Sequence, residues 1–178
     1  MSKAVLISIR PKWVEKIASG EKIIEVRKTS PNLSLPFKAY IYCTLPKYPH
    51  EDFIATDYPR PQFYGGGKVI GEFTCDRIDR LAPANEPYGI YDIDDDYVLQ
   101  TCLENGALWD YGHGTPLYGW HISDLRIYDT PKELSEFKTL CRVDADCCAC
   151  PYYNYTKMEC DGRVIGRPPQ SWCYVEAM

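Results

Sequence analysis

The sequence predicts an α+β fold, with a curved sheet or a small mixed β-barrel and flanking helices. Two observations indicate it. Most apolar patterns in the chain are of strand type, and the helical patterns do not alternate regularly with them as they would in a doubly wound sheet. The chain has 178 residues, of which 45% are hydrophobic and 25% charged, so its composition is globular and it can bury a core.

The chain opens with a strand followed by a helix. Residues 4–9 are apolar and β-branched, which is typical of a buried strand. Pro11 can occupy the first turn of a helix over residues 12–19, and Gly20 stands in the usual position just past the helix end.

Strand patterns dominate the rest of the chain. In residues 22–28 apolar and charged positions alternate, so we expect Glu25 and Arg27 on one face of the strand. Residues 68–78 form a long strand pattern that Gly71 interrupts, which indicates a bulge or a barrel bend. The other predicted elements are strands over 38–43 and 121–128 and helices over 92–105 and 131–137.

The charge of the chain is unevenly distributed. The net charge is −5, which argues against an extended footprint on duplex DNA. Residues 1–50 nevertheless hold nine Lys and Arg against three Asp and Glu. This basic segment is either an ordinary solvated surface or a cationic rim around an anion-binding pocket.

No run of apolar residues approaches the length needed to span a bilayer. The first residues lack the basic region, long apolar stretch and cleavage site of a signal peptide. We therefore expect a cytoplasmic protein with no membrane partner.

The helix-to-strand junction near the N-terminus carries a distinctive motif. Gly20, Lys22 and Arg27 form a Gly-x-Lys-x-x-x-x-Arg frame, with Glu25 three residues after the lysine. This frame resembles the signature of the ASCH family, and the resemblance extends over roughly residues 4–137. Residues 69–73 and 119–125 resemble later strands of the family, and residues 167–175 resemble extensions on phage-associated bacterial members.

The resemblance implies a PUA-like barrel with a cleft beside the first helix. It also implies a module that binds RNA or a modified nucleoside or nucleotide. Some bacterial relatives are amidohydrolases of N4-acylated cytidines that use a Lys, a Thr and a Glu. Lys22 occupies the place of that lysine, Glu25 stands where the threonine is expected, and Glu72 is a candidate for the distant glutamate. A ribonuclease-like enzyme and a protein-interaction module are further alternatives, and whether the chain is an enzyme stays open.

The candidate ligand-binding residues lie around this junction. Arg27 can grip a phosphate or carboxylate with two parallel hydrogen bonds, and Lys22 can hold an anion as a compact charge. Glu25 can accept an amino proton from a base, and in an enzyme Lys22 and Glu25 would be the catalytic pair. Arg10 flanks the same cleft, and Trp13 can stack on a base. The alternatives are that Glu25 and Arg27 merely pair with each other and that Trp13 packs in the core.

The chain has nine cysteines, and six of them lie between Cys141 and Cys173. Cys147 and Cys150 have the spacing with which two thiolates share a tetrahedral zinc ion. Cys160 and Cys173 would complete the site, with Cys141 or Cys148 as alternates. Unpaired thiols, or a redox pair at Cys147 and Cys150, are the competing interpretations.

We expect the zinc to be structural, because this section has little helix or strand pattern of its own and a metal could order it. The sequence thus predicts an ASCH or PUA-like barrel domain over residues 1–140, with a Cys-rich extension over residues 141–178 packed on it.

Overall fold

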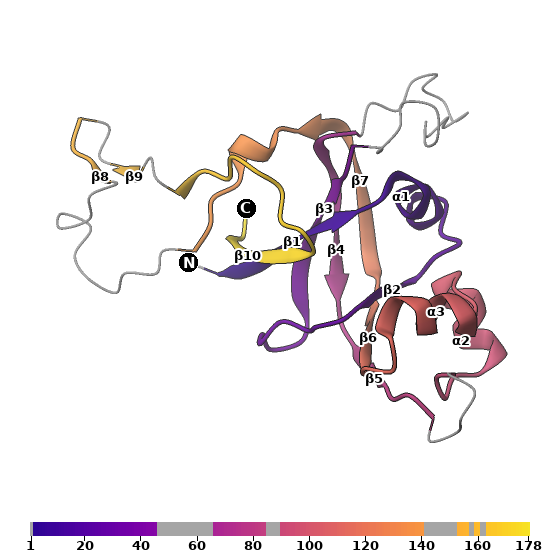
Figure 1. Cartoon of the computed structure of the whole chain (residues 1–178). Coiled ribbons are helices and arrows are strands. Elements are labelled where there is room, and N and C mark those ends of the chain that lie inside the picture. The colour runs from indigo at the N-terminus through magenta and orange to yellow at the C-terminus, as the bar shows by residue number, and fades with distance from the viewer. Residues whose placement is uncertain (1, 46–65, 85–89, 141–152, 157–158, 161–162) are drawn as a thin grey trace.

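The computed structural model describes residues 2–45, 66–84, 90–140, 153–156, 159–160 and 163–178. The elements within these ranges are β1 (Lys3–Ile9), α1 (Pro11–Ala18), β2 (Ile24–Arg27), β3 (Phe37–Cys43), β4 (Lys68–Cys75), β5 (Ile78–Leu81), α2 (Asp95–Thr101), α3 (Asn105–Gly112), β6 (Leu117–His121), β7 (Ser123–Lys132), the 3₁₀ turn η1 (Leu134–Glu136), β8 (Tyr153–Asn154), β9 (Glu159–Cys160) and β10 (Trp172–Glu176) (Figure 1).

Two sheets dominate the described part of the chain. One has the strand order β10-β1-β3-β4-β7 and the other the order β2-β6-β5. Only the β1–β3 pair in these two sheets is parallel, with α1 in the connection between its strands. The predicted α+β class is therefore confirmed. The predicted barrel is not seen as a closed one, because the strands in the described ranges pair within two separate sheets.

Two long arms pass from one sheet to the other. β4 continues into β5 through residues 76–77, and β6 continues into β7 through Ile122. The backbone N–H of His121 donates to the carbonyl of Arg77 at 2.9 Å, which ties the two corners together. The predicted strands over residues 68–78 and 121–128 run through these two corners without a break, and most of β5 and β6 lies outside them. The arms curve the sheets around a shared core.

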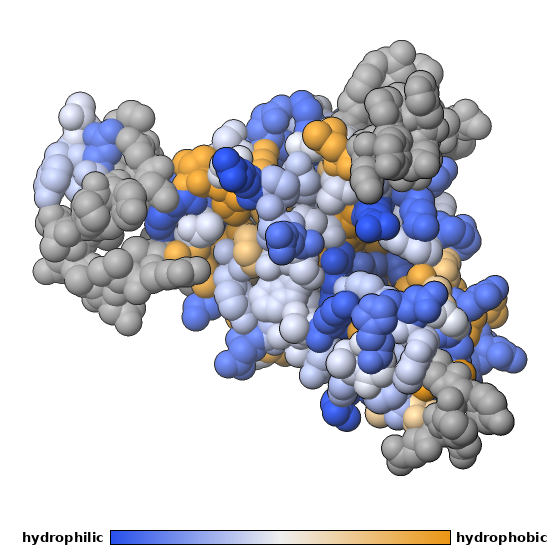
Figure 2. All heavy atoms as spheres, in the orientation of Figure 1, coloured by the Kyte–Doolittle hydropathy of each residue, from blue (hydrophilic) through white to orange (hydrophobic). Residues whose placement is uncertain are grey.

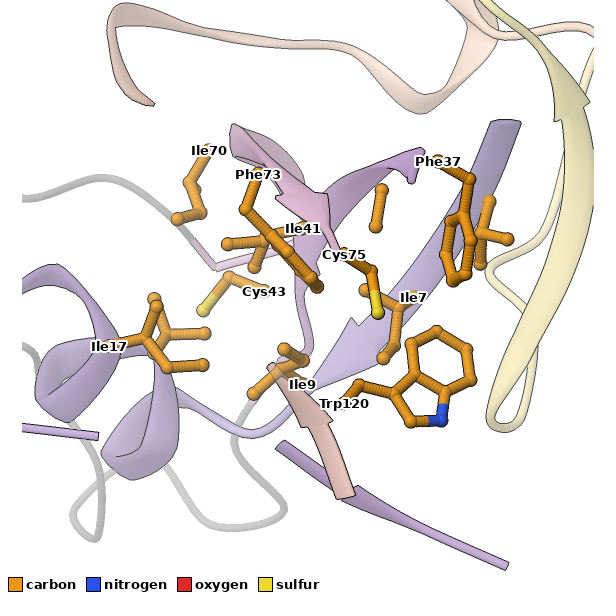
Figure 3. Packing of buried hydrophobic residues seen from close by; sticks show 13 residues of the cluster. Ile7, Ile9, Ile17, Phe37, Ile41, Cys43, Ile70, Phe73, Cys75 and Trp120 are labelled. Atoms are coloured by element: carbon orange, nitrogen blue, oxygen red, sulfur yellow. The ribbon is translucent and has the colours of Figure 1, made fainter. Parts of the chain in front are cut away.

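The main apolar core lies between the two sheets and α1 (Figure 3). Trp120 of β6 is fully buried there, and its ring meets that of Phe37 of β3 edge to face at 5.7 Å. Val14 and Ile17 are the buried face of α1, as the helical spacing of the sequence predicts. Packing α1 onto this core fixes the position of the loop that leads into β2.

Two further apolar clusters cover the outer faces of the sheets. Beyond the large sheet, Tyr40 packs against Phe137 at a ring distance of 5.0 Å, and Ile165 joins them. Beyond the small sheet, Val26 packs with Tyr91 and with Leu108 of α3. The small sheet is therefore buried on both faces, with the main core on one and the α2–α3 pair on the other.

The predicted helices after residue 90 differ from the observed ones. The helix predicted over residues 92–105 is observed only as α2, which ends because Cys102 takes a left-handed conformation with φ 54°. α3 begins at Asn105, and the sequence pattern does not predict it. The predicted helix over 131–137 shrinks to η1, whose N-cap is Glu133. Glu133 and Glu136 form a capping box there, and β7 runs on to Lys132.

The C-terminal residues belong to the large sheet. β10 pairs with β1 in antiparallel register, with Cys173 opposite Leu6. The N–H of Ala177 donates to the carbonyl of Ser2 at 2.9 Å, and Figure 1 shows β10 running alongside β1. The end of the predicted 141–178 extension is thus hydrogen-bonded to the first strand of the predicted 1–140 domain. In the described ranges no helix is both long and apolar enough to cross a membrane.

Gly71 marks a register shift in β4, where the pairing with both neighbouring strands is interrupted. A Cβ at this position would lie 2.5 Å from the carbonyl oxygen of Arg126 and 3.2 Å from the Cα of Ile127. The predicted bulge is therefore confirmed, and close approach of the β7 backbone explains why glycine occupies it.

We expect Gly71→Ala to lower the free energy of unfolding by about 1–3 kcal/mol, because backbone atoms of β7 must move to admit the methyl group. Gly106→Ala is the matched control. A Cβ on Gly106 of α3 would have no neighbour within 4 Å, and alanine favours helix, so this variant should be as stable as the parent or more stable. Urea unfolding of both variants measures the difference; equal stability would contradict the packing described for β4.

Candidate functional site

Three charged side chains form a buried ion triad at the junction of α1 and β2. Lys22, Glu25 and Arg27 are only 1%, 6% and 8% exposed. The Lys22 Nζ lies 3.4 Å from Glu25 Oε2, and an Arg27 terminal nitrogen lies 2.9 Å from Glu25 Oε1. The predicted pairing of Glu25 with Arg27 is therefore present, and Lys22 extends it to a row of three.

Strand alternation explains how β2 directs these groups. Glu25 lies opposite Trp120 in the β2–β6 pair, on the face that looks toward the main core. Ile24 and Val26 alternate with the charged residues, and Val26 packs in the cluster beneath α3. Because both faces of the small sheet are covered, even the polar face of this strand is buried.

Lys22 uses all three of its N–H groups inside the protein. It donates to the carbonyl of Ile24 at 2.8 Å and to that of Thr101 at 2.6 Å, and Glu25 is its third neighbour. Burial lowers the pKa of Lys22, and the Glu25 carboxylate acts in the opposite direction. Lys22 thus joins α2 to β2 and orients the Glu25 carboxylate.

Arg27 is less completely bonded. It donates to the carbonyl of Ser8 in β1 at 2.6 Å and to Glu25. Its Nε is buried and has no hydrogen-bond partner among the described residues. A buried donor without a partner costs about 1–3 kcal/mol, so this N–H is suited to an oxygen supplied by a ligand.

Trp13 lies at one end of the triad. Its ring centroid is 5.3 Å from Lys22 Nζ and 4.6 Å from Lys12 Nζ, both within cation–π range. The indole is half-buried and packs against the main core, so the packing interpretation holds for part of the ring. Arg10 is exposed at the start of α1, and in the described part of the chain no contact joins its side chain to the triad.

Glu72 lies away from the triad. It follows the bulge in β4 on the face opposite to Phe73, which is in the main core. Its carboxylate accepts from Tyr128 at 2.7 Å and from Lys38 at 3.2 Å. Lys22, Glu25 and Glu72, which stand for the Lys, the Thr and the Glu of the amidohydrolases, are therefore not assembled into one site.

The predicted zinc ligands fall largely outside the described residues. Cys147 and Cys150 lie there, and for Cys160 only the backbone pairing of β9 with β8 is described. Cys173 is half-buried in the apolar cluster that includes Phe137, and burial raises the pKa of its thiol. This environment suits a small core residue better than a zinc thiolate. No metal-binding group of His, Cys, Asp or Glu occurs within the described ranges, and structural zinc stays a prediction.

Sequence reasoning missed three contributors to the site. Thr101 and Ser8 act through backbone carbonyls, which no side-chain motif reveals. Tyr111 belongs to α3, an element that lies beyond the helix predicted over residues 92–105 and that the sequence pattern does not predict. Its hydroxyl is close enough to Arg27 and Glu25 for both charges to act on its pKa.

The surface around the site is mixed in character. In the view of Figure 2, hydrophilic residues predominate over α1 and the α2–α3 pair, with smaller apolar patches between them. Figure 1 shows that β2 runs between these helical elements. The buried triad therefore lies beneath a largely polar rim.

We expect Lys22→Met to lower the free energy of unfolding by about 3 kcal/mol, because it leaves two buried carbonyls and one side of Glu25 without a donor. Lys16→Met is the control, since Lys16 forms an ion pair with Glu21 on the surface and its loss should change stability little. Thermal and urea unfolding measure both variants. Equal effects would show that the triad is not a structural contact.

Comparison with solved structures identifies the fold. The chain is similar to the ASCH protein from Zymomonas mobilis, at 19% identity and a TM-score of 0.56, over 97% of this chain and 87% of that one. A serine-to-alanine variant of that protein matches at 19% identity and a TM-score of 0.56, over 97% and 88% of the two chains. A tyrosine-to-phenylalanine variant matches at 20% identity and a TM-score of 0.57, over 98% of this chain and 91% of that one. No family model and no curated protein matches the sequence. The chain thus has the fold of these ASCH proteins over nearly its whole length.

Proposed function

We propose that the protein binds RNA, or a modified nucleoside or nucleotide, at the junction of α1 and β2. The observation that carries the proposal is the buried ion triad, in which the Arg27 Nε–H has no partner among the described residues. A fold shared with ASCH proteins is compatible with this function.

The chemistry of the triad suits a nucleotide. The Arg27 guanidinium can donate to a phosphate or to a base carbonyl. The Glu25 carboxylate has lone pairs beyond those that face Arg27 and Lys22, and these can accept an amino proton from a base. Since Lys22 is already fully bonded, we assign it the role of holding Glu25 in place rather than of touching the ligand.

The charge balance favours a small ligand or a short single strand. The whole chain is acidic, and besides the ion-paired Lys16 and Lys22 the cations near the junction in the described part of the chain are few: Arg10, Lys12, Arg27 and Lys28. A protein that neutralises few phosphates loses little affinity as salt rises. Binding that depends only weakly on ionic strength is therefore expected.

Fluorescence anisotropy with a labelled single-stranded RNA of about 6–8 nucleotides, a length within the range of single-strand binding sites, tests the proposal. Glu25→Gln should weaken binding by about tenfold, since loss of one base contact is worth about 1–3 kcal/mol. Glu72→Gln is the control, because it removes the same charge on the other face of the large sheet.

Circular dichroism melting of both variants separates binding from folding. Equal loss of affinity in Glu25→Gln and Glu72→Gln would show that the ligand does not bind at the junction of α1 and β2. Absence of RNA and nucleotide binding by the parent protein would overturn the proposed function itself.

A further inference from the structure

The site continues beyond the triad to a second aromatic side chain. Tyr111 of α3 is exposed, and its ring centroid lies 5.0 Å from the Nζ of Lys28, the residue that follows Arg27. Because Lys28 directly follows Arg27, this contact places the ring at the Arg27 end of the triad. Burial raises the pKa of the Tyr111 hydroxyl, with Arg27 lowering it and Glu25 raising it.

The same kind of pair, a lysine over an aromatic ring, flanks each end of the triad. At the α1 end, Lys12 lies over Trp13, and at the α3 end, Lys28 lies over Tyr111. Both lysines are exposed and neither is ion-paired in the described part of the chain. Between these ends stand the three linked side chains of the triad. Figure 1 shows α1 and α3 on either side of β2.

A pair made of an aromatic ring and a lysine can bind one nucleotide. The ring stacks on the base and the ammonium meets the phosphate, and every base has a face that can stack. A nucleotide that binds there would displace the lysine from the ring. This would break no ion pair of that lysine in the described part of the chain. Because the triad separates the two rings, a base stacked on one ring leaves the other ring available.

We propose that the site takes two consecutive nucleotides of a single strand, one on Trp13 with Lys12 and one on Tyr111 with Lys28, with Glu25 and Arg27 between them. This inference rests on the proposed function and adds the length of the ligand and the second subsite. Tyr111 and Lys28 are thereby assigned as ligand-binding residues.

Isothermal titration with 5′-phosphorylated oligoadenylates of one, two and four nucleotides tests the inference. The affinity for the dinucleotide should be at least about tenfold higher than that for the mononucleotide, because a second base stacks. Extension from two to four nucleotides should change the affinity by less than about threefold, because the described residues supply no further aromatic–lysine pair beside the triad.

Variants at each end test the second subsite. Tyr111→Ala and Trp13→Ala should each reduce dinucleotide affinity to about that of the mononucleotide. Lys12→Ala and Lys28→Ala keep the test valid if an aromatic variant folds poorly, because both lysines are exposed; each should weaken the dinucleotide severalfold. Tyr155→Ala, which removes another exposed tyrosine, is the control and should bind as the parent does.

The outcomes separate the two proposals. If Trp13→Ala weakens binding while Tyr111→Ala and Lys28→Ala do not, or if one and two nucleotides bind equally, the two-nucleotide site is wrong and the proposed function stands. If neither oligoadenylates nor RNA bind at all, the proposed function fails.

Discussion

The fold is organised around the burial of three charges where α1, β1, β2 and α2 meet. Removing charged groups from water is costly, and only fixed partners in good geometry offset that cost. Here the partners are the Glu25 carboxylate and the backbone carbonyls of Ser8, Ile24 and Thr101. Since these carbonyls come from β1, β2 and the end of α2, the hydrogen bonds to them form only when all three elements are in place. The same requirement keeps Glu25 and Arg27 in one orientation, which is the property a binding site needs.

The curvature of the two sheets creates the buried position of the triad. The β4–β5 and β6–β7 arms turn from the large sheet into the small one, and Trp120 fills the space between the sheets. Gly71 lets β7 lie close to β4 at the bulge. On the other side, α2 and α3 close the small sheet and bring Thr101 and Tyr111 to β2. Local packing and the polar site are therefore parts of one arrangement.

Much of the first half of this arrangement could be predicted from the sequence. The strand over residues 4–9, the helix after Pro11 and the strand that carries Glu25 and Arg27 follow from local periodicity, and the glycine frame linked them to an ASCH-like fold. The corners at residues 76–77 and 122 could not, because strand propensity is continuous across them. The hydrogen bonds of Lys22 could not be predicted either, since one of its acceptors is the backbone carbonyl of Thr101, 79 residues away. Burial on both faces of β2 depends on tertiary packing rather than on local pattern.

In the proposed complex, the Arg27 Nε–H, which is buried and has no partner among the described residues, is a contact point for the ligand. The most direct measurement is a titration of ¹⁵N-labelled protein with a short single-stranded RNA, followed at the Arg27 Nε–Hε resonance. The Trp120 Nε1–H is an internal reference, because it is also buried and unpartnered among the described residues but lies in the apolar core. We expect the Arg27 signal to shift in proportion to the bound fraction while the Trp120 signal changes little. A bound state in which the Arg27 signal does not move would contradict the proposed contact.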